Sequence, residues 1–376
     1  MTYQEALTRI IDEIVAPEAA QTDQSGHFPR KTIDALAEAG LLGLTVPEEF
    51  GGGAGGLREG ADVVRQLSAA CGSTAMIVMM HYSALAVLGA TGRGDVLREV
   101  ASGRHLSTLA FSETGSRSHF WAPMSTATAA DDEVVLDARK SWVTSAHEAD
   151  SYVWSSRPLS AAGPMSLWLV PSGIPGLSVS ANFDGLGLRG NDSCPIVADG
   201  VRVPGSAILG ADGAGLDIAL SAALPWFLML NASASVGLMQ AVTAETAEHL
   251  ARTRLEHLGQ TLSGQVQARA ALARMRIDTD RSRALVHDAL DAVESGREDA
   301  QLLVLQVKAA AGDSAAAVAD LAMKTCGGAA FRKELGIERR LRDSLASRVM
   351  APTSEALHDF VGRALCGLPL LDAADA

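Results

Sequence analysis

Residues 112–119 read Ser-Glu-Thr-Gly-Ser-Arg-Ser-His and gather hydroxyls, a carboxylate and an imidazole in one short segment. Glycine lets a backbone approach an anion closely, and the free N–H groups of such a loop can point at a phosphate. The segment is therefore a candidate for binding an anionic cofactor, although a plain surface loop can have the same composition.

Three side chains are candidates for accepting a proton: His81, Glu113 and His119. Histidine and carboxylate groups are the usual general bases in enzymes. His81 lies in the apolar run 74–87, where a lone histidine is more often a core residue, and Glu113 can equally brace its own loop. The four cysteines are scattered without a CxxC pair, so we predict no metal site.

The elements that must position these groups change type twice along the chain. Apolar residues recur at helical spacing in residues 1–107 and again in 216–376, whereas short β-prone runs fill 108–215. The β-prone runs are separated by Gly, Pro, Asp and Ser clusters, as in a small antiparallel barrel or sandwich. We therefore predict three domains: an N-terminal helical domain (1–107), a central β domain (108–215) and a C-terminal helical bundle (216–376).

Five segments in this α-β-α order resemble the acyl-CoA dehydrogenase family of flavoproteins. Residues 46–52 (Val-Pro-Glu-Glu-Phe-Gly-Gly) are similar to its Pro-Glu-Glu-aromatic-Gly-Gly turn. Residues 110–119 stand where the family has Thr-Glu-Pro-Gly-x-Gly-Ser-Asp, and 140–146 (Lys-Ser-Trp-Val-Thr-Ser-Ala) resemble Lys-x-aromatic-Ile-Thr-Asn-Gly. Residues 187–193 and 326–343 resemble its Gly-x-Arg-Gly and Gly-Gly-x-Gly…Glu-Arg-x-x-Arg-Asp segments. The resemblance covers essentially the whole chain. It implies an α+β fold with an N-terminal α-helical domain, a central antiparallel β-barrel domain and a C-terminal four-helix bundle.

The resemblance also implies an FAD site between the central and last domains, completed by a neighbouring subunit. In the family, the aromatic residue at the place of Trp142 packs on the flavin, and the hydroxyl at the place of Thr144 reaches its N5 region. The glycines at 327–328 match residues that lie against the FAD of the neighbouring subunit. The implied cofactor contacts are Ser112, Ser118, Trp142, Val143, Thr144, Arg254, Gly327, Gly328 and Thr353.

The sequence differs from the family pattern at the residue that the family uses to remove a proton. Residues 351–355 read Ala-Pro-Thr-Ser-Glu, where most of the family has Glu-Gly-Thr-Ser and uses that Glu to remove the α-proton of an acyl thioester. The methyl group of Ala351 cannot take a proton. Some family members carry the base on the helix that opens the last domain, but residues 222–228 contain neither Glu nor Arg. His81, Glu113 and His119 are the candidates for a relocated base.

Three functions fit this pattern. The first is an FAD-dependent oxidoreductase acting on the CH–CH bond of an acyl thioester, carried by coenzyme A or an acyl-carrier protein. It would pass its electrons to an electron-acceptor flavoprotein or a reductase. The second is a flavin-dependent monooxygenase on the same scaffold, which needs no such Glu. The third is a base-less partner subunit that pairs with a base-bearing homologue.

Composition limits the partners. The formal net charge of −13 argues against nucleic-acid and anionic-membrane partners. The longest apolar stretch, 218–230, is interrupted by Ser221 and Pro225 and is too short to span a bilayer, and no signal peptide is visible. We expect a cytoplasmic homodimer or homotetramer. A basic patch of Arg332, Lys333, Arg339 and Arg340 would receive an acidic carrier protein.

Overall fold

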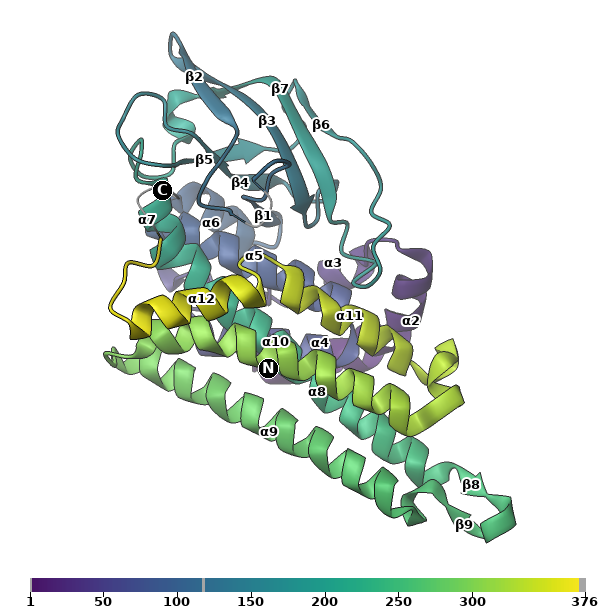
Figure 1. Cartoon of the computed structure of the whole chain (residues 1–376). Helices are drawn as coiled ribbons and strands as arrows, with labels where there is room; N and C mark the ends of the chain where they lie inside the picture. The colour runs from purple at the N-terminus through teal and green to yellow at the C-terminus, as the bar shows by residue number, and fades with distance from the viewer. Residues whose placement is uncertain (1, 117–118, 372–376) are drawn as a thin grey trace.

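Helices form the N-terminal part of the computed structural model, which describes residues 2–116 and 119–371 (Figure 1). Thr2 and Glu5 bond to each other's backbone N–H groups in a capping box that begins α1. The apolar run 74–87 lies in α5, which is apolar all round and buried along most of its length. The helices are α1 (Tyr3–Ile10), α2 (Ala16–Ser25), α3 (Arg30–Glu38), α4 (Leu57–Ala70), α5 (Gly72–Ala90) and α6 (Gly94–Ala101).

Two packed sheets form the central domain. One has the order β1-β4-β5 and the other β2-β3-β7-β6. The large side chains of Trp154 and Trp168 are fully buried in the core of this domain. The predicted antiparallel pairing holds except for β1 and β4, which run parallel because the β2–β3 hairpin of the other sheet lies between them in the chain. The strands are β1 (Ser107–Ala110), β2 (Thr126–Ala130), β3 (Glu133–Val143), β4 (Ser151–Ser156), β5 (Ser166–Pro171), β6 (Leu177–Val179) and β7 (Cys194–Pro204).

Long helices form the C-terminal bundle, as predicted. The central helix α10 packs against α8, α9 and α11, and α8 also packs on α4 of the N-terminal part. A short hairpin, β8 (Arg254–Leu255) and β9 (Gln260–Thr261), projects from the far ends of α8 and α9 (Figure 1). The helices are α7 (Gly215–Ile218), α8 (Leu224–Arg252), α9 (Val266–Ser295), α10 (Ala300–Cys326), α11 (Ile337–Val349) and α12 (Ser354–Leu365).

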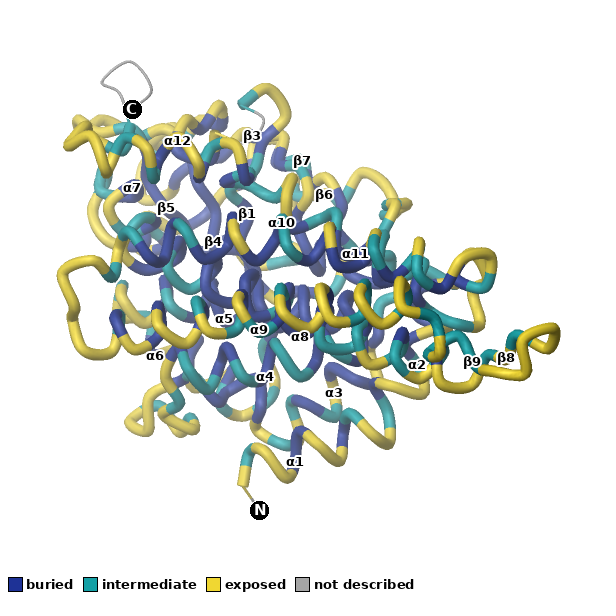
Figure 2. The backbone as a smooth tube through the Cα atoms, turned by 60° about the horizontal axis from the view of Figure 1, so that its bottom comes forward, coloured by how far each residue is buried: buried dark blue, intermediate teal, exposed yellow. Residues whose placement is uncertain are grey.

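Three helical stretches are long and apolar enough to cross a membrane by length and composition: Gly72–Ala90, Gly215–Arg252 and Ala300–Phe331. By sequence alone, the stretch 218–230 is judged too short to span a bilayer. That stretch is part of the longer helical stretch Gly215–Arg252, so the judgement of its length was wrong. The most apolar windows of these stretches are 83%, 78% and 67% buried inside the fold. Figure 2 shows the same burial along α5, α8 and α10. Packing within the protein thus accounts for their apolar character.

Candidate active site

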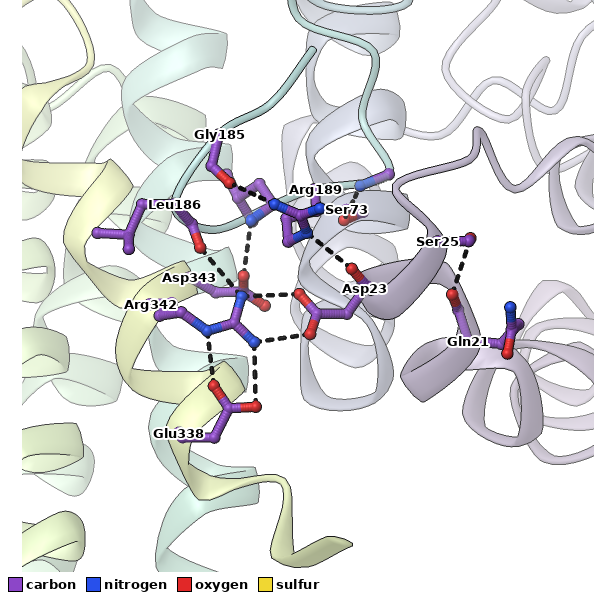
Figure 3. A network of polar contacts seen from close by, with 12 residues as sticks. Gln21, Asp23, Ser25, Ser73, Gly185, Leu186, Arg189, Glu338, Arg342 and Asp343 are labelled. Atoms are coloured by element: carbon purple, nitrogen blue, oxygen red, sulfur yellow. Dashed lines mark hydrogen bonds and ion pairs between the residues drawn. The ribbon is translucent and has the colours of Figure 1, made fainter. Parts of the chain in front are cut away.

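An ion-pair network joins all three parts of the chain at one place (Figure 3). The guanidinium of Arg342 on α11 donates to both oxygens of Asp23 on α2, at 2.8 and 2.6 Å. It also bonds to Glu338 one turn earlier and to the carbonyl of Leu186 in the β6–β7 loop. Arg189 of that loop donates to the Asp23 carbonyl at 2.9 Å. The network therefore fixes the β6–β7 loop against the N-terminal and C-terminal helices.

Two contacts seat the same loop directly on α11. The backbone N–H of Leu188 donates to the Asp343 carboxylate at 2.7 Å. A Cβ atom on Gly187 would stand 2.5 Å from the Arg342 carbonyl oxygen, so only glycine allows this approach. Asp343 is buried, and its burial raises the pKa of the carboxyl to about 6. The segment 187–193 thus positions a buried acid.

The end of β3 presents an exposed indole beside a buried hydroxyl. Trp142 has a φ of 57° and is 69% exposed, an unusual state for a large aromatic residue. Val143 is buried and pairs with Cys194 of β7. Thr144 is fully buried, and its hydroxyl lies 3.1 Å from that of Ser193. Backbone hydrogen bonds from Ser145 N–H to the Asn191 carbonyl and from Ala146 N–H to the Asp192 carbonyl, both 3.0 Å, tie this strand end to the β6–β7 loop.

Two of the three candidate bases are occupied by structural contacts. His81 is fully buried; its Nδ1 accepts from the Ser107 N–H at 3.1 Å and its Nε2 lies 3.2 Å from the Leu42 carbonyl. Burial lowers the pKa of His81 to about 4. Both ring nitrogens are therefore engaged in the core, and neither is free for a substrate proton.

Glu113 is equally engaged. Its carboxylate bonds to the buried ammonium of Lys140 at 2.5 Å, to the hydroxyl of Ser125 and to the N–H groups of Met124 and Ser125. Burial alone would raise the pKa of Glu113, but Lys140 and these donors hold it below its usual range. The side chain braces its loop and has no free lone pair directed at a ligand.

His119 remains accessible. The ring is exposed, its Nδ1 lies 3.1 Å from the Ser116 carbonyl, and it packs edge-on against Trp121 at 5.0 Å. Trp121 in turn contacts Phe360 of α12 at 5.5 Å. Since α12 begins at Ser354, His119 belongs to a loop that packs on the helix following Ala351. Its Nε2 has no hydrogen-bond partner among the described residues.

A buried lysine holds the segment that contains Ala351. Lys308 of α10 donates from its Nζ to the carbonyls of Met350 and Pro352, at 2.7 and 2.5 Å. Burial lowers the pKa of Lys308 to about 7. Thr353 then caps α12, because its hydroxyl accepts from the Ala356 N–H at 3.2 Å. Lys308 was not among the residues selected from the sequence; a lone lysine within an apolar helical run was the available signal.

The remaining residues expected at the cofactor divide into two places. Ser112 follows β1 and is half-buried, next to Glu113, whereas Ser118 lies outside the described residues. Arg254 is in the distal β8–β9 hairpin, exposed and 3.7 Å from Glu256. Gly327 and Gly328 directly follow α10. The expectation that these glycines lie against the FAD of a neighbouring subunit stays a prediction.

The expected basic patch is smaller than the sequence indicated. Arg340 is only 4% exposed, and its guanidinium bonds to Glu245 and to the carbonyls of Ser68 and Ala69. Arg332 pairs with Glu334 at the surface. Arg339 is half-buried, whereas Arg332 and Lys333 are exposed. Burial of Arg340 therefore leaves fewer exposed cations at this place than the sequence indicated.

FAD fits what this chain presents. Trp142 offers a bare aromatic face, and the loop at Gly115 takes a φ of 108° that favours glycine. The hydroxyl of Ser116 in this loop is buried without a hydrogen-bond partner among the described residues, a state that is rare unless a ligand completes it. Trp142, Thr144 and the loop around Ser116 are the residues that would hold the cofactor.

These features define a flavin-dependent oxidoreductase, and comparison with known proteins agrees. Residues 2–100, 108–201 and 213–366 match the N-terminal, middle and C-terminal domains of acyl-CoA dehydrogenase. A probable acyl-CoA dehydrogenase, YngJ of Bacillus subtilis, is 29% identical over 363 residues, which are 93% of each chain. The mitochondrial isovaleryl-CoA dehydrogenase of Oryza sativa is 29% identical over 373 residues, covering 96% of this chain and 90% of the relative.

Solved structures share the fold. Butyryl-CoA dehydrogenase of Megasphaera elsdenii superposes with a TM-score of 0.90 at 22% identity, over 97% of this chain and 99% of that structure. The chain therefore belongs to the acyl-CoA dehydrogenase family. It is an FAD-dependent oxidoreductase of the type that acts on the CH–CH bond of acyl thioesters, and its cofactor is FAD.

Proposed function

We propose that this protein dehydrogenates the Cα–Cβ bond of an acyl thioester, with a proton acceptor other than residue 351. The observation that carries the proposal is the retained Trp142–Thr144 strand end, with its exposed indole and buried hydroxyl, in a chain whose segment at Ala351 is still held in place by Lys308. In the reaction, Cα loses a proton to a base and Cβ loses a hydride. FAD supplies the hydride acceptor when it is bound.

His119 is the proposed proton acceptor, because its Nε2 has no partner among the described residues, whereas His81 and Glu113 are committed to the core. General-base catalysis contributes roughly 10² to 10⁴-fold in rate. Trp142 and Thr144 would bind and orient the cofactor.

The carrier is coenzyme A or an acyl-carrier protein. Both carriers present the acyl group on a pantetheine arm, so the residues around the acyl group do not show which carrier is used. The curated relatives above are named for coenzyme A substrates, which supports coenzyme A. Burial of Arg340 removes one of the four cations expected to receive an acidic carrier protein, which supports the same choice.

The test is anaerobic addition of acyl thioesters to the FAD-loaded protein, followed by flavin absorbance. Bleaching of the flavin supports dehydrogenation. His119→Gln should then lower the bleaching rate by about 10²-fold or more while FAD stays bound. His287→Gln, at an exposed position on α9, should leave the rate unchanged. A bound flavin that no thioester bleaches, but that supports NADH-dependent oxygen uptake with a reductase, would replace the proposal with oxygenation.

A further inference from the structure

A cavity of about 40 Å³ lies between α4, α5, α8, α10 and α11. Met76 and Met79 of α5 and Met350 at the end of α11 form its apolar side. Met350 is also the residue directly before Ala351, and Lys308 holds its carbonyl. The cavity therefore adjoins the segment where the family places its catalytic carboxylate.

The opposite side of the cavity is polar. Asn231 of α8 is 2% exposed, and its Oδ1 accepts from the Ser347 hydroxyl at 2.5 Å. Ser347 in turn lies 3.3 Å from the hydroxyl of Ser235. The Nδ2 of Asn231 has no hydrogen-bond partner among the described residues. A buried amide that keeps an unused donor costs stability unless a ligand or water accepts from it.

A second polar atom of the same lining lacks a partner. Asp343 stands one helical turn before Ser347 on α11, and one of its oxygens accepts from Leu188 N–H. Its other oxygen has no hydrogen-bond partner among the described residues. That oxygen would lie 2.8 Å from a Cβ atom on Gly72, so glycine at this position leaves room beside the carboxyl. The cavity thus offers one unused donor and one unused acceptor.

We propose that this cavity receives the far end of the acyl group and that this end carries a hydroxyl. The proposal rests on the function proposed above and adds the substrate class, a short hydroxyacyl thioester. A hydroxyl both accepts from Asn231 and donates to Asp343, whereas an ammonium group can only donate and a methyl group can do neither.

The size of the cavity sets the length of that group. A water-sized group needs about 10–15 Å³ by this measure, so the cavity holds only a few such groups. The three methionine side chains close the apolar side, and a long alkyl chain would have to displace them. The combination of small volume and unused polar atoms separates this cavity from a plain fatty-acyl channel.

The test uses two pantetheine thioesters of equal length, because pantetheine is the arm that both carriers share. 4-Hydroxybutyryl-pantetheine and pentanoyl-pantetheine differ only in a terminal hydroxyl in place of a methyl group. Dissociation constants are measured anaerobically on the FAD-loaded protein by calorimetry, with flavin absorbance recorded in parallel. The hydroxyacyl thioester is expected to bind at least about 10-fold more tightly, since sites built to bond a hydroxyl reject analogues that lack it.

Asn231→Leu replaces the amide by an apolar side chain of similar size and should abolish or reverse the preference. Ser233→Ala is the matched control, because Ser233 is on the same helix and bonds only to the Met229 carbonyl. Equal binding of the two thioesters by the wild type, or a preference that survives Asn231→Leu, would overturn the inference.

The two proposals fail in different ways. A preference for the hydroxyacyl thioester without flavin bleaching would support the cavity and contradict dehydrogenation. Bleaching by both thioesters with equal affinity would support dehydrogenation and contradict the cavity. Binding of neither thioester would contradict both.

Discussion

Lys308 Nζ lies 2.5 Å from the carbonyl oxygen of Pro352, on the far side of Ala351 from its second acceptor, Met350. One buried amine therefore fixes the backbone on both sides of Ala351. The segment keeps these hydrogen bonds although residue 351 itself carries no carboxylate.

Lys308→Met should destabilise the protein by about 2 kcal/mol or more, because it leaves two buried carbonyls without their donor. Urea unfolding measures the change. Lys324→Met is the control: Lys324 is exposed and pairs only with Asp320 on its own helix, so the expected loss is below about 0.5 kcal/mol. Equal losses in the two variants would show that the buried contacts do not stabilise the segment.

The same lysine should give stability a pH dependence. The pKa of Lys308 is about 7 in the folded protein, against 10.5 without the fold. Between these two pH values Lys308 is protonated in the unfolded chain and neutral in the folded protein. The free energy of unfolding therefore increases as pH rises. The free energy of unfolding of the wild type, relative to Lys308→Met, should therefore rise from pH 7 toward pH 10. If the free energies of unfolding of the two proteins differ by the same amount from pH 7 to pH 10, the pKa of Lys308 is not lowered by the fold.

Ala351→Glu returns a carboxylate to the position that the family uses for proton removal. If the wild type is limited by proton transfer, flavin bleaching by a thioester should accelerate by roughly 10²-fold or more. Ala351→Gln has the same shape without the base and should show no gain. Stopped-flow absorbance under anaerobic conditions distinguishes them, and equal rates for the two variants would show that proton removal does not limit bleaching.

Trp142→Ala should weaken FAD binding without unfolding the protein. The side chain is 69% exposed, so its removal costs the fold little. Aromatic stacking is worth about 0.5–1.5 kcal/mol, which corresponds to a roughly 2- to 12-fold higher dissociation constant for FAD. Fluorescence titration of the apoprotein gives the constant. Leu365→Ala, at another exposed apolar position, should leave it unchanged.

Arg342 and Asp23 should be strongly coupled. Both are mostly buried and joined by two hydrogen bonds. Removing Arg342 leaves the Asp23 carboxylate without its partner and should cost about 3 kcal/mol, whereas removing Asp23 should cost less because Arg342 keeps its hydrogen bonds to Glu338. The double variant Asp23→Asn with Arg342→Met should lose less than the sum of the single losses. Strict additivity in a double-mutant cycle measured by urea unfolding would show that the contact drawn in Figure 3 contributes nothing to stability.

Several features could be predicted from the sequence because they depend on neighbouring residues. The α-β-α order follows from local periodicity, and the segments around Trp142 and Thr144 carry their pattern within a few residues. Ala351 was visible for the same reason: a substitution inside a short motif needs no structure to be seen.

Tertiary structure decided the rest. Glu113 is held in an ion pair with Lys140, and both ring nitrogens of His81 bond to backbone groups in the core. No local sequence pattern shows either contact. Asn231 and Ser347 are 116 residues apart in the chain, yet helix packing joins them in one cavity. The sequence by itself determined the elements and showed Ala351 where the resemblance predicts a Glu. Which polar groups meet depends on how the helices pack, because such contacts are set by the shape and burial of distant segments and not by spacing along the chain.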